Sequence, residues 1–90
     1  MEPMNENTVF AELWCIVRDY YAPYMTASEA TKKAMKAMAD NGHEVTDLGP
    51  KMFMVDDEIF EIVKHRKTKW AGPWTHFNIR HHGYRWEQNS

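Results

Sequence analysis

Two short apolar runs separated by three consecutive acids constrain this chain more than any other feature. The runs Met52–Val55 and Ile59–Val63 are rich in Phe, Val and Ile, and neither contains Gly or Pro. This composition is typical of β-strands, and the acids between the runs are typical of a polar turn. With the first two acids as turn residues, an antiparallel hairpin is expected in which Met54 lies opposite Ile59 and Phe53 lies opposite Phe60.

Two helices are expected before this hairpin. From Thr8 to about Tyr21 the apolar side chains recur at helical spacing, and Pro23 ends that helix because the residue before a proline avoids helical geometry. The segment from Thr26 to Glu29 has the pattern of a capping box. A second helix is therefore predicted from there to about residue 40, with Asn41-Gly42 as its left-handed cap. Its predicted inner stripe is Ala30, Ala34, Ala37 and Met38.

A second hairpin is predicted near the C-terminus, after a break at Gly72-Pro73. Its polar positions alternate with Thr75, Phe77, Ile79 and His81. We interpret His82-Gly83 as a two-residue turn, which would pair His81 with Tyr84 and set Arg80 across from Arg85. The segment His43–Leu48 is left open as a short strand or an extended connector.

The expected architecture is α+β, with two N-terminal helices packed on one face of a small antiparallel sheet of three to four strands, in the order α-α-β-β-β-β. Ninety residues make a single domain, 1–90, in which residues 1–6 are expected to be frayed and 88–90 to form a tail. The sheet face away from the helices is then open.

The charges of the chain are divided unevenly along its length. Residues 1–60 hold 11 acids and 5 bases, a net of −6, whereas residues 61–90 hold 2 acids and 6 bases, a net of +4. The total is −2, and the division favours oriented encounter with a charged partner. The single cysteine, the lack of a membrane-length apolar run and the lack of a signal peptide favour a soluble, cytoplasmic protein without membrane association.

Catalytic and metal-binding patterns are weak in this sequence. The histidines 76, 81 and 82, with His65 or Cys15, suggest a metal site, but strand alternation points His81 away from the other two, and no Cys-x-x-Cys or His-Glu-x-x-His spacing is present. The acids at 56–58 should diverge at a hairpin tip. Cys15 is interpreted as a buried thiol acting as a small hydrophobe. We therefore expect no enzyme activity, no cofactor and no metal.

A binding function remains, and its surface is the open sheet face. We expect a small non-catalytic module, a regulator, inhibitor or adaptor, that binds an acidic protein partner through basic and aromatic side chains. Size and motif content are compatible with a small regulator of a phage or other mobile element. The predicted contact residues are Trp74, His76, Asn78, Arg80 and Arg85, with Lys67 and Lys69 as electrostatic support.

The alternative partner is a nucleic acid. The bases Lys64, Arg66, Lys67 and Lys69 can hold phosphates, and Trp70, Trp74 and His76 can stack on unpaired bases. The sequence does not decide between the two partners or predict an oligomeric state.

Overall fold

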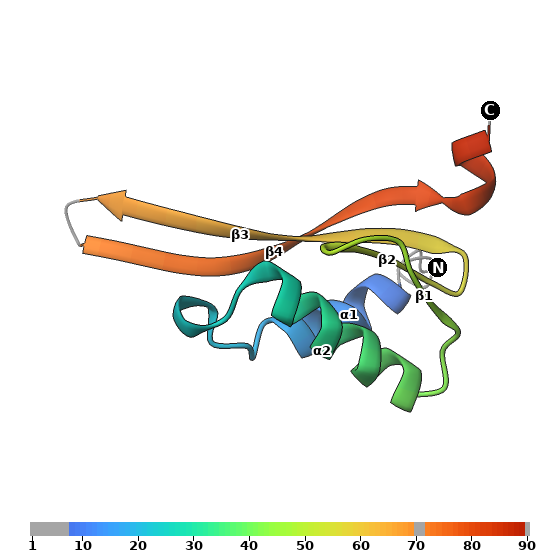
Figure 1. Cartoon of the computed structure of the whole chain (residues 1–90), viewed down its shortest axis with the longest axis horizontal. Helices are drawn as coiled ribbons and strands as arrows, with labels where there is room; N and C mark the ends of the chain where they lie inside the picture. Colours follow the sequence, from blue (N-terminus) through green and yellow to red (C-terminus); the bar gives the residue numbers. More distant parts are fainter. Residues whose placement is uncertain (1–7, 70–71, 90) are drawn as a thin grey trace, which may run out of the picture.

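Two helices followed by a four-stranded antiparallel sheet make up the fold, which confirms the predicted α+β class and element order (Figure 1). The computed structural model describes residues 8–69 and 72–89, and for residues 66–69, 72–74, 88 and 89 it describes the backbone only. The elements are α1 (Thr8–Val17), the 3₁₀ turn η2 (Ala22–Tyr24), α2 (Ala27–Asp40), β1 (Val45–Asp47), β2 (Met52–Val55), β3 (Glu58–Lys69), β4 (Gly72–Tyr84) and the 3₁₀ helix η3 (Arg85–Asn89).

Helix α1 ends at Val17, about one turn before the predicted end at Tyr21. After Val17 the backbone tightens, because the Tyr20 amide bonds to the Val17 carbonyl at 3.0 Å, three residues back. Tyr20 is still packed against the core, although from a turn and not from the helix. Tyr20 therefore fits the helical spacing of apolar residues although the helix ends at Val17, and for this reason the predicted helix was too long.

Helix α2 begins and ends as predicted. Thr26 Oγ1 accepts a hydrogen bond from the Glu29 amide at 3.1 Å, and Glu29 Oε1 accepts one from the Thr26 amide at 2.9 Å, which completes the capping box. At the other end Gly42 has φ 98°. The Gly42 and His43 amides bond to the Ala39 and Met38 carbonyls at 3.0 and 3.1 Å, the two bonds of a Schellman motif.

The first hairpin has the predicted register. Phe53 lies opposite Phe60 and Met54 opposite Ile59, and Asp56 takes the left-handed conformation that the turn requires, with φ 57°. The segment His43–Leu48, which the sequence left open as a strand or a connector, contains the short strand β1, which pairs antiparallel with β2. The sheet order is β1-β2-β3-β4.

The second hairpin differs from the prediction. Strand β3 does not end at residue 63 but continues to Lys69, and β4 continues through His82-Gly83 to Tyr84. Between the pairs Phe60–His81 and Glu58–Tyr84, β4 has one residue more than β3, so His82-Gly83 forms a β-bulge instead of a turn. Gly83, at φ 87°, supplies the left-handed conformation there. The predicted pairs His81–Tyr84 and Arg80–Arg85 are therefore wrong.

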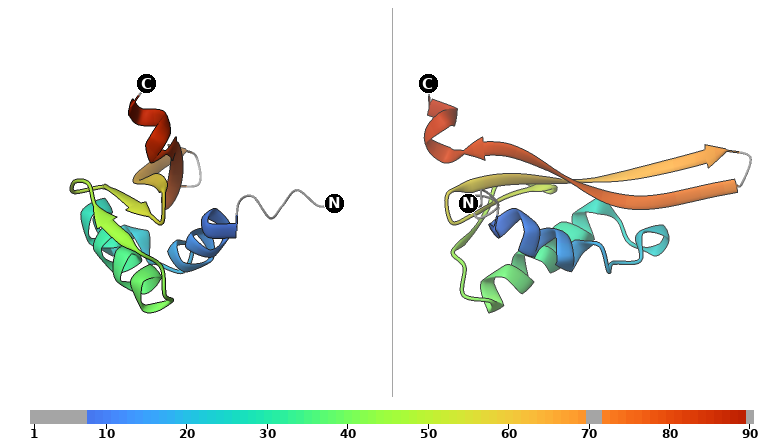
Figure 2. Two further views of the ribbon diagram at one scale, coloured as in Figure 1. Left: turned by 90° about the vertical axis from the view of Figure 1, so that its right-hand side faces the viewer. Right: turned by 180° about the vertical axis from the view of Figure 1, so that it is seen from behind.

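The hydrophobic core lies between the helices and one face of the sheet (Figure 2). Three of the four residues of the predicted α2 stripe are fully buried, and Ala37 is half-buried. Thr31 is also buried, and its hydroxyl donates to the Ala27 carbonyl at 2.7 Å, which satisfies the polar group. The core side chains with at most 1% exposure are Leu13, Val17, Ala30, Ala34, Met38, Phe53, Val55, Phe60 and Ile62.

Beyond the core, β3 and β4 continue as a two-stranded ribbon that projects past the helices (Figure 1). The basic run starts at Lys64, which is paired with the core residue Phe77, and continues along β3 into this ribbon. Lys64 itself turns to the helical side, where its ammonium donates to the Met25 carbonyl at 2.8 Å. Neither helix in the described ranges combines the length and apolar character that a membrane span requires.

Candidate functional site

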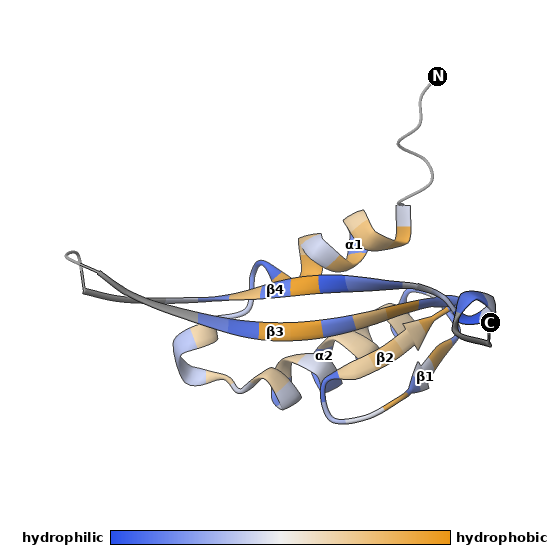
Figure 3. Cartoon of the chain, turned by 90° about the horizontal axis from the view of Figure 1, so that it is seen from above, coloured by the Kyte–Doolittle hydropathy of each residue, from blue (hydrophilic) through white to orange (hydrophobic). Residues whose placement is uncertain are grey.

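The sheet face opposite the helices is the candidate site, and we call it the open face (Figure 3). Side chains alternate between the two faces of a strand, so the buried Phe53, Phe60 and Ile62 fix which residues point away from the helices. Cross-strand register then gives the rest. The open face consists of Thr46 of β1, Met52 and Met54 of β2, Ile59, Glu61, Val63 and His65 of β3, and His76, Asn78, Arg80 and His82 of β4.

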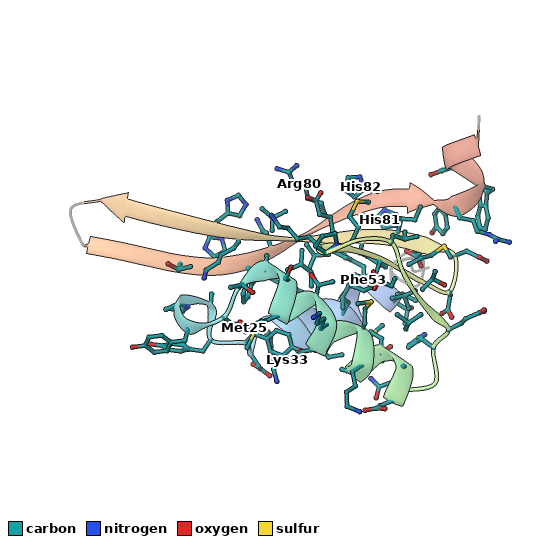
Figure 4. The ribbon with its side chains drawn as sticks, viewed as in Figure 1. Met25, Lys33, Phe53, Arg80, His81 and His82 are labelled. Carbon is teal, nitrogen blue, oxygen red and sulfur yellow. The ribbon has the colours of Figure 1, made fainter. Side chains whose placement is uncertain are left out.

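Arg80 is the central cation of the open face. It lies across from Glu61, but the Glu61 carboxylate accepts a hydrogen bond from His82 Nε2 at 2.9 Å. Figure 4 shows Arg80 and His82 on the side of the sheet away from the helices, whereas Phe53 lies on the helical side. The Arg80 side chain is exposed and has no hydrogen-bond or ion-pair partner among the described residues. Its charge is therefore available to a partner.

Apolar side chains surround this cation. Met52 lies across from Glu61 on β2, Val63 lies across from Asn78, and both are half-buried, as is Met54. Asn78 is exposed. Flexible Met side chains next to an arginine give a surface that can adapt to a protein while offering one directional contact.

The open face continues toward the ribbon through a pair of histidines. His65 and His76 are cross-strand partners, and their rings stack at a centroid distance of 5.4 Å. Three further predicted contact residues follow along the ribbon. The backbones of Lys67 and Trp74 are paired and that of Lys69 is paired with Gly72, but the side chains of Lys67, Lys69 and Trp74 lie outside the described part of the chain.

Arg85 was expected beside Arg80, and the structure places it elsewhere. It lies in η3, beyond the bulge, where its Nε is 3.2 Å from Asp57 Oδ1 of the β2–β3 turn. The Arg85 amide also bonds to the Asp57 carbonyl at 2.9 Å. Because the strand does not turn at residue 83, Arg80 and Arg85 do not face each other, and no like-charge repulsion arises between them.

His81 points to the helical side, as the alternation predicted. Its ring packs on Phe60 at 5.3 Å, and its Nε2 donates to Glu58 Oε1 at 3.1 Å. Glu58 is only 7% exposed, so this hydrogen bond satisfies a buried carboxylate. His81 therefore supports the fold, whereas His76 and His82 belong to the open face.

A histidine that the sequence did not single out joins three segments of the fold. His43 follows α2, and its Nε2 lies 2.9 Å from Glu12 Oε1 of α1 while its Nδ1 lies 2.9 Å from Asp56 Oδ2 of the hairpin turn. Asn41 also donates to Glu12 at 2.7 Å. We call Glu12, His43 and Asp56 the carboxylate clamp. The hydrogen bonds to Asp56 and then Glu12 raise the pKa of His43, and the bond from His43 lowers the pKa of both carboxyl groups.

The clamp is a structural feature and does not form a cation site. Its two carboxylates lie against opposite nitrogens of one ring, an arrangement that favours a proton on each nitrogen. Across the residues that the structure describes, no three His, Cys, Asp or Glu side chains are grouped so that they could hold a metal ion. Cys15 is exposed, so the expectation of a buried thiol is wrong. It lies on the outer side of α1, next to the exposed Trp14.

Met52, Met54 and Val63 are among the members of the open face that the sequence did not assign. The predicted register contained the necessary signal, because it paired these strands correctly. Both faces of the hairpin carry apolar residues, however, so the pattern did not say which side met the helices.

No protein-family model, no curated protein and no solved structure matches the chain.

Proposed function

We propose that this protein is a non-catalytic binding module, a regulator, inhibitor or adaptor, that binds an acidic surface of another protein through the open face. The observation that carries the proposal is that Arg80 is exposed while the carboxylate of its cross-strand neighbour, Glu61, is already bonded to His82. Charge-assisted bonds to arginine are among the stronger polar contacts at interfaces. The half-buried Met52, Met54 and Val63 add apolar area around it.

Capture of a partner by a charge-reversed variant tests this proposal. Arg80→Glu should abolish capture from a lysate of cells that naturally contain the protein, because it sets a carboxylate against the acidic partner. Lys33→Glu is the matched control. It makes the same change of charge at an exposed position of α2, on the helical side of the molecule (Figure 4). Equal capture by both variants and the parent would show that the partner does not bind at the open face.

A nucleic acid is the second candidate partner, favoured by the projecting ribbon and the basic run on β3. The case is weaker than the sequence indicated, because Lys64 is bonded to the Met25 carbonyl on the helical side. Nuclease treatment of the lysate and a salt series distinguish the two. Binding to a single-stranded oligonucleotide that falls steeply with salt would favour the nucleic acid, and nuclease-resistant capture of one protein favours the proposal.

We place the protein in the cytoplasm as part of the same proposal. The support is its single, exposed cysteine, which has no intrachain disulfide partner and fits a reducing compartment.

A further inference from the structure

Among the described residues, strand β4 forms one border of the sheet and has only β3 as a neighbour. Its outer edge is therefore a row of backbone groups that could pair with another strand. Two features limit the part of this edge that is open. The bulge at His82-Gly83 ends the regular ladder on one side, and Pro73, which has no amide hydrogen, ends it on the other. Residues 75–81 remain between them.

The register shows which backbone groups face outward. The Ile62 amide bonds to the Lys51 carbonyl, so the even-numbered residues of β3 face β2 and its odd-numbered residues face β4. The odd residues Glu61 and Val63 pair with Arg80 and Asn78. The even residues of β4 thus bond to β3, and the odd residues present their amides and carbonyls outward. These residues are Thr75, Phe77, Ile79 and His81.

These outward groups are unused within the described chain. No hydrogen bond from a described residue outside β3 reaches the backbone of Thr75, Phe77, Ile79 or His81. A partner strand could therefore pair with these backbone groups without breaking a hydrogen bond of the described chain.

A groove of about 680 Å³ lies beside the same edge. Its walls come from the end of α1 and the η2 turn on one side and from β4 on the other. The lining residues that matter here are Trp14, Tyr20, Tyr21 and Pro23 on the helical side, and Thr75 and Phe77 on the strand. Tyr21 is 62% exposed and Trp14 is 37% exposed. An apolar side chain carried by an added strand would gain contact area there.

The charges along this edge favour a negatively charged segment as the occupant. Strand β4 contains no acid, and Arg80 lies on its open face. Arg18 lines the groove, and its only described ion pair is a long one of 3.9 Å to the neighbouring, exposed Asp19. A strand with carboxylates on both of its faces would meet one arginine on each side of the sheet.

We propose that an extended acidic segment of a partner protein adds to β4 as a fifth strand, with an apolar side chain in the groove beside Trp14 and Tyr21. This inference rests on the proposed function and specifies its partner. Edge pairing between two copies of this chain is disfavoured, because it would set one acid-free β4 against another and leave Arg80 without a carboxylate.

Backbone hydrogen exchange along β4 tests the inference in the intact protein. In the free protein the amides of Phe77 and Ile79 should exchange fast, and those of Asn78 and Arg80 should be protected by β3. The probe is a peptide of about eight residues with two adjacent glutamates at each end, so that both of its faces carry carboxylates, and with valines around one central phenylalanine. It is long enough for the open part of the edge. Its binding should protect Phe77 and Ile79. The same peptide with lysine for glutamate is the control and should not bind.

Two N-methylated forms of the acidic peptide provide a second measurement that leaves the protein unchanged. Methyl groups on alternate residues block one edge of an extended peptide and leave the other edge intact. Loss of two backbone hydrogen bonds should weaken binding by about 5-fold to about 150-fold. One methylated form should show this loss, and the form methylated on the opposite edge should bind like the parent peptide.

The remaining outcomes overturn the inference in distinguishable ways. Binding that leaves Phe77 and Ile79 unprotected would mean docking on the open face without strand addition, and the proposed function would stand. No binding of the acidic peptide would reject the acidic strand, while capture by the parent and not by Arg80→Glu would still support the proposed function. Protection in the free protein that disappears on dilution would identify a second copy as the occupant.

Discussion

The two faces of strands β3 and β4 differ in how their polar groups are used. On the helical face, Lys64 bonds to a backbone carbonyl and the buried Glu58 accepts from His81. On the open face, Arg80 and Asn78 are exposed, and Arg80 has no partner among the described residues. One pair of strands therefore combines a satisfied interior with a surface that leaves a charge available. The comparison indicates that stability and binding can be changed separately.

The largest expected effect comes from the helical face. Phe60 is fully buried and packs between Phe10 and Phe53, at ring distances of 6.2 and 6.0 Å. Phe60→Ala should lower the free energy of unfolding by about 3–5 kcal/mol, because it leaves a cavity that the core cannot refill. Asn78→Ala, on the opposite face, should change it by less than about 0.5 kcal/mol. Urea unfolding measures both, and equal losses would contradict the division between the faces.

A smaller effect is expected at the start of α2. Thr26→Ala removes the side-chain acceptor of the capping box and should lower the free energy of unfolding by about 1 kcal/mol. Thr26→Ser keeps the hydroxyl and is the control. Thermal unfolding of the three proteins checks the prediction, and a serine variant as unstable as the alanine variant would show that the hydroxyl is not responsible.

The carboxylate clamp should make stability depend on pH. The pKa of His43 is raised above its ordinary 6.5, so its stabilising contribution is complete below that value and is lost as pH rises through the folded-state pKa. The pKa values of Glu12 and Asp56 are lowered from 4.5 and 3.8, so their contribution is present above those values and is lost as pH falls through the folded-state pKa. The clamp therefore contributes most between pH 4.5 and 6.5.

The His43→Gln variant isolates this contribution from the other histidines. The difference in unfolding free energy between parent and variant should be largest near pH 5.5 and shrink toward pH 8 and toward pH 3. The maximum should not exceed about 1 kcal/mol, since the pairs are partly exposed. A difference that grows with rising pH would contradict the sign derived for His43.

The smallest effect on stability is expected at Arg80. Arg80→Ala should change the free energy of unfolding by less than about 0.5 kcal/mol, because no described partner is lost. Lys33→Ala on the outer side of α2 provides the comparison. Differential scanning calorimetry of both variants checks the prediction, and a clear loss in Arg80→Ala alone would show that this side chain supports the fold.

The sequence predicted those parts of the fold that local chemistry determines. The capping box at Thr26, the left-handed stop at Gly42 and the register of the first hairpin all depend on residues close together in the chain, and all are present. The pattern of His82-Gly83 misled because a two-residue turn and a β-bulge both favour a left-handed glycine. The choice between them is made by β3, whose long ladder carries β4 through residue 83.

The candidate site, like the fold, was predicted correctly only where local sequence pattern decides it. Alternation placed His76, Asn78, Arg80 and His82 on one side, and this is what the register gives. Arg85 was misplaced together with the turn, since one wrong turn reverses the direction of every later residue. The link from His43 to Glu12 and Asp56 spans 31 and 13 residues, and no local pattern indicates such contacts.

The central claim is that the open face receives the partner, and hydroxyl-radical footprinting of the methionines tests it most directly. Met52 and Met54 lie on the open face, and the half-buried Met35 of α2 is an internal reference on the helical side. Binding of the captured partner should slow the oxidation of Met52 and Met54 and leave that of Met35 unchanged. Unchanged oxidation of Met52 and Met54 in the complex, with Met35 protected instead, would contradict the account.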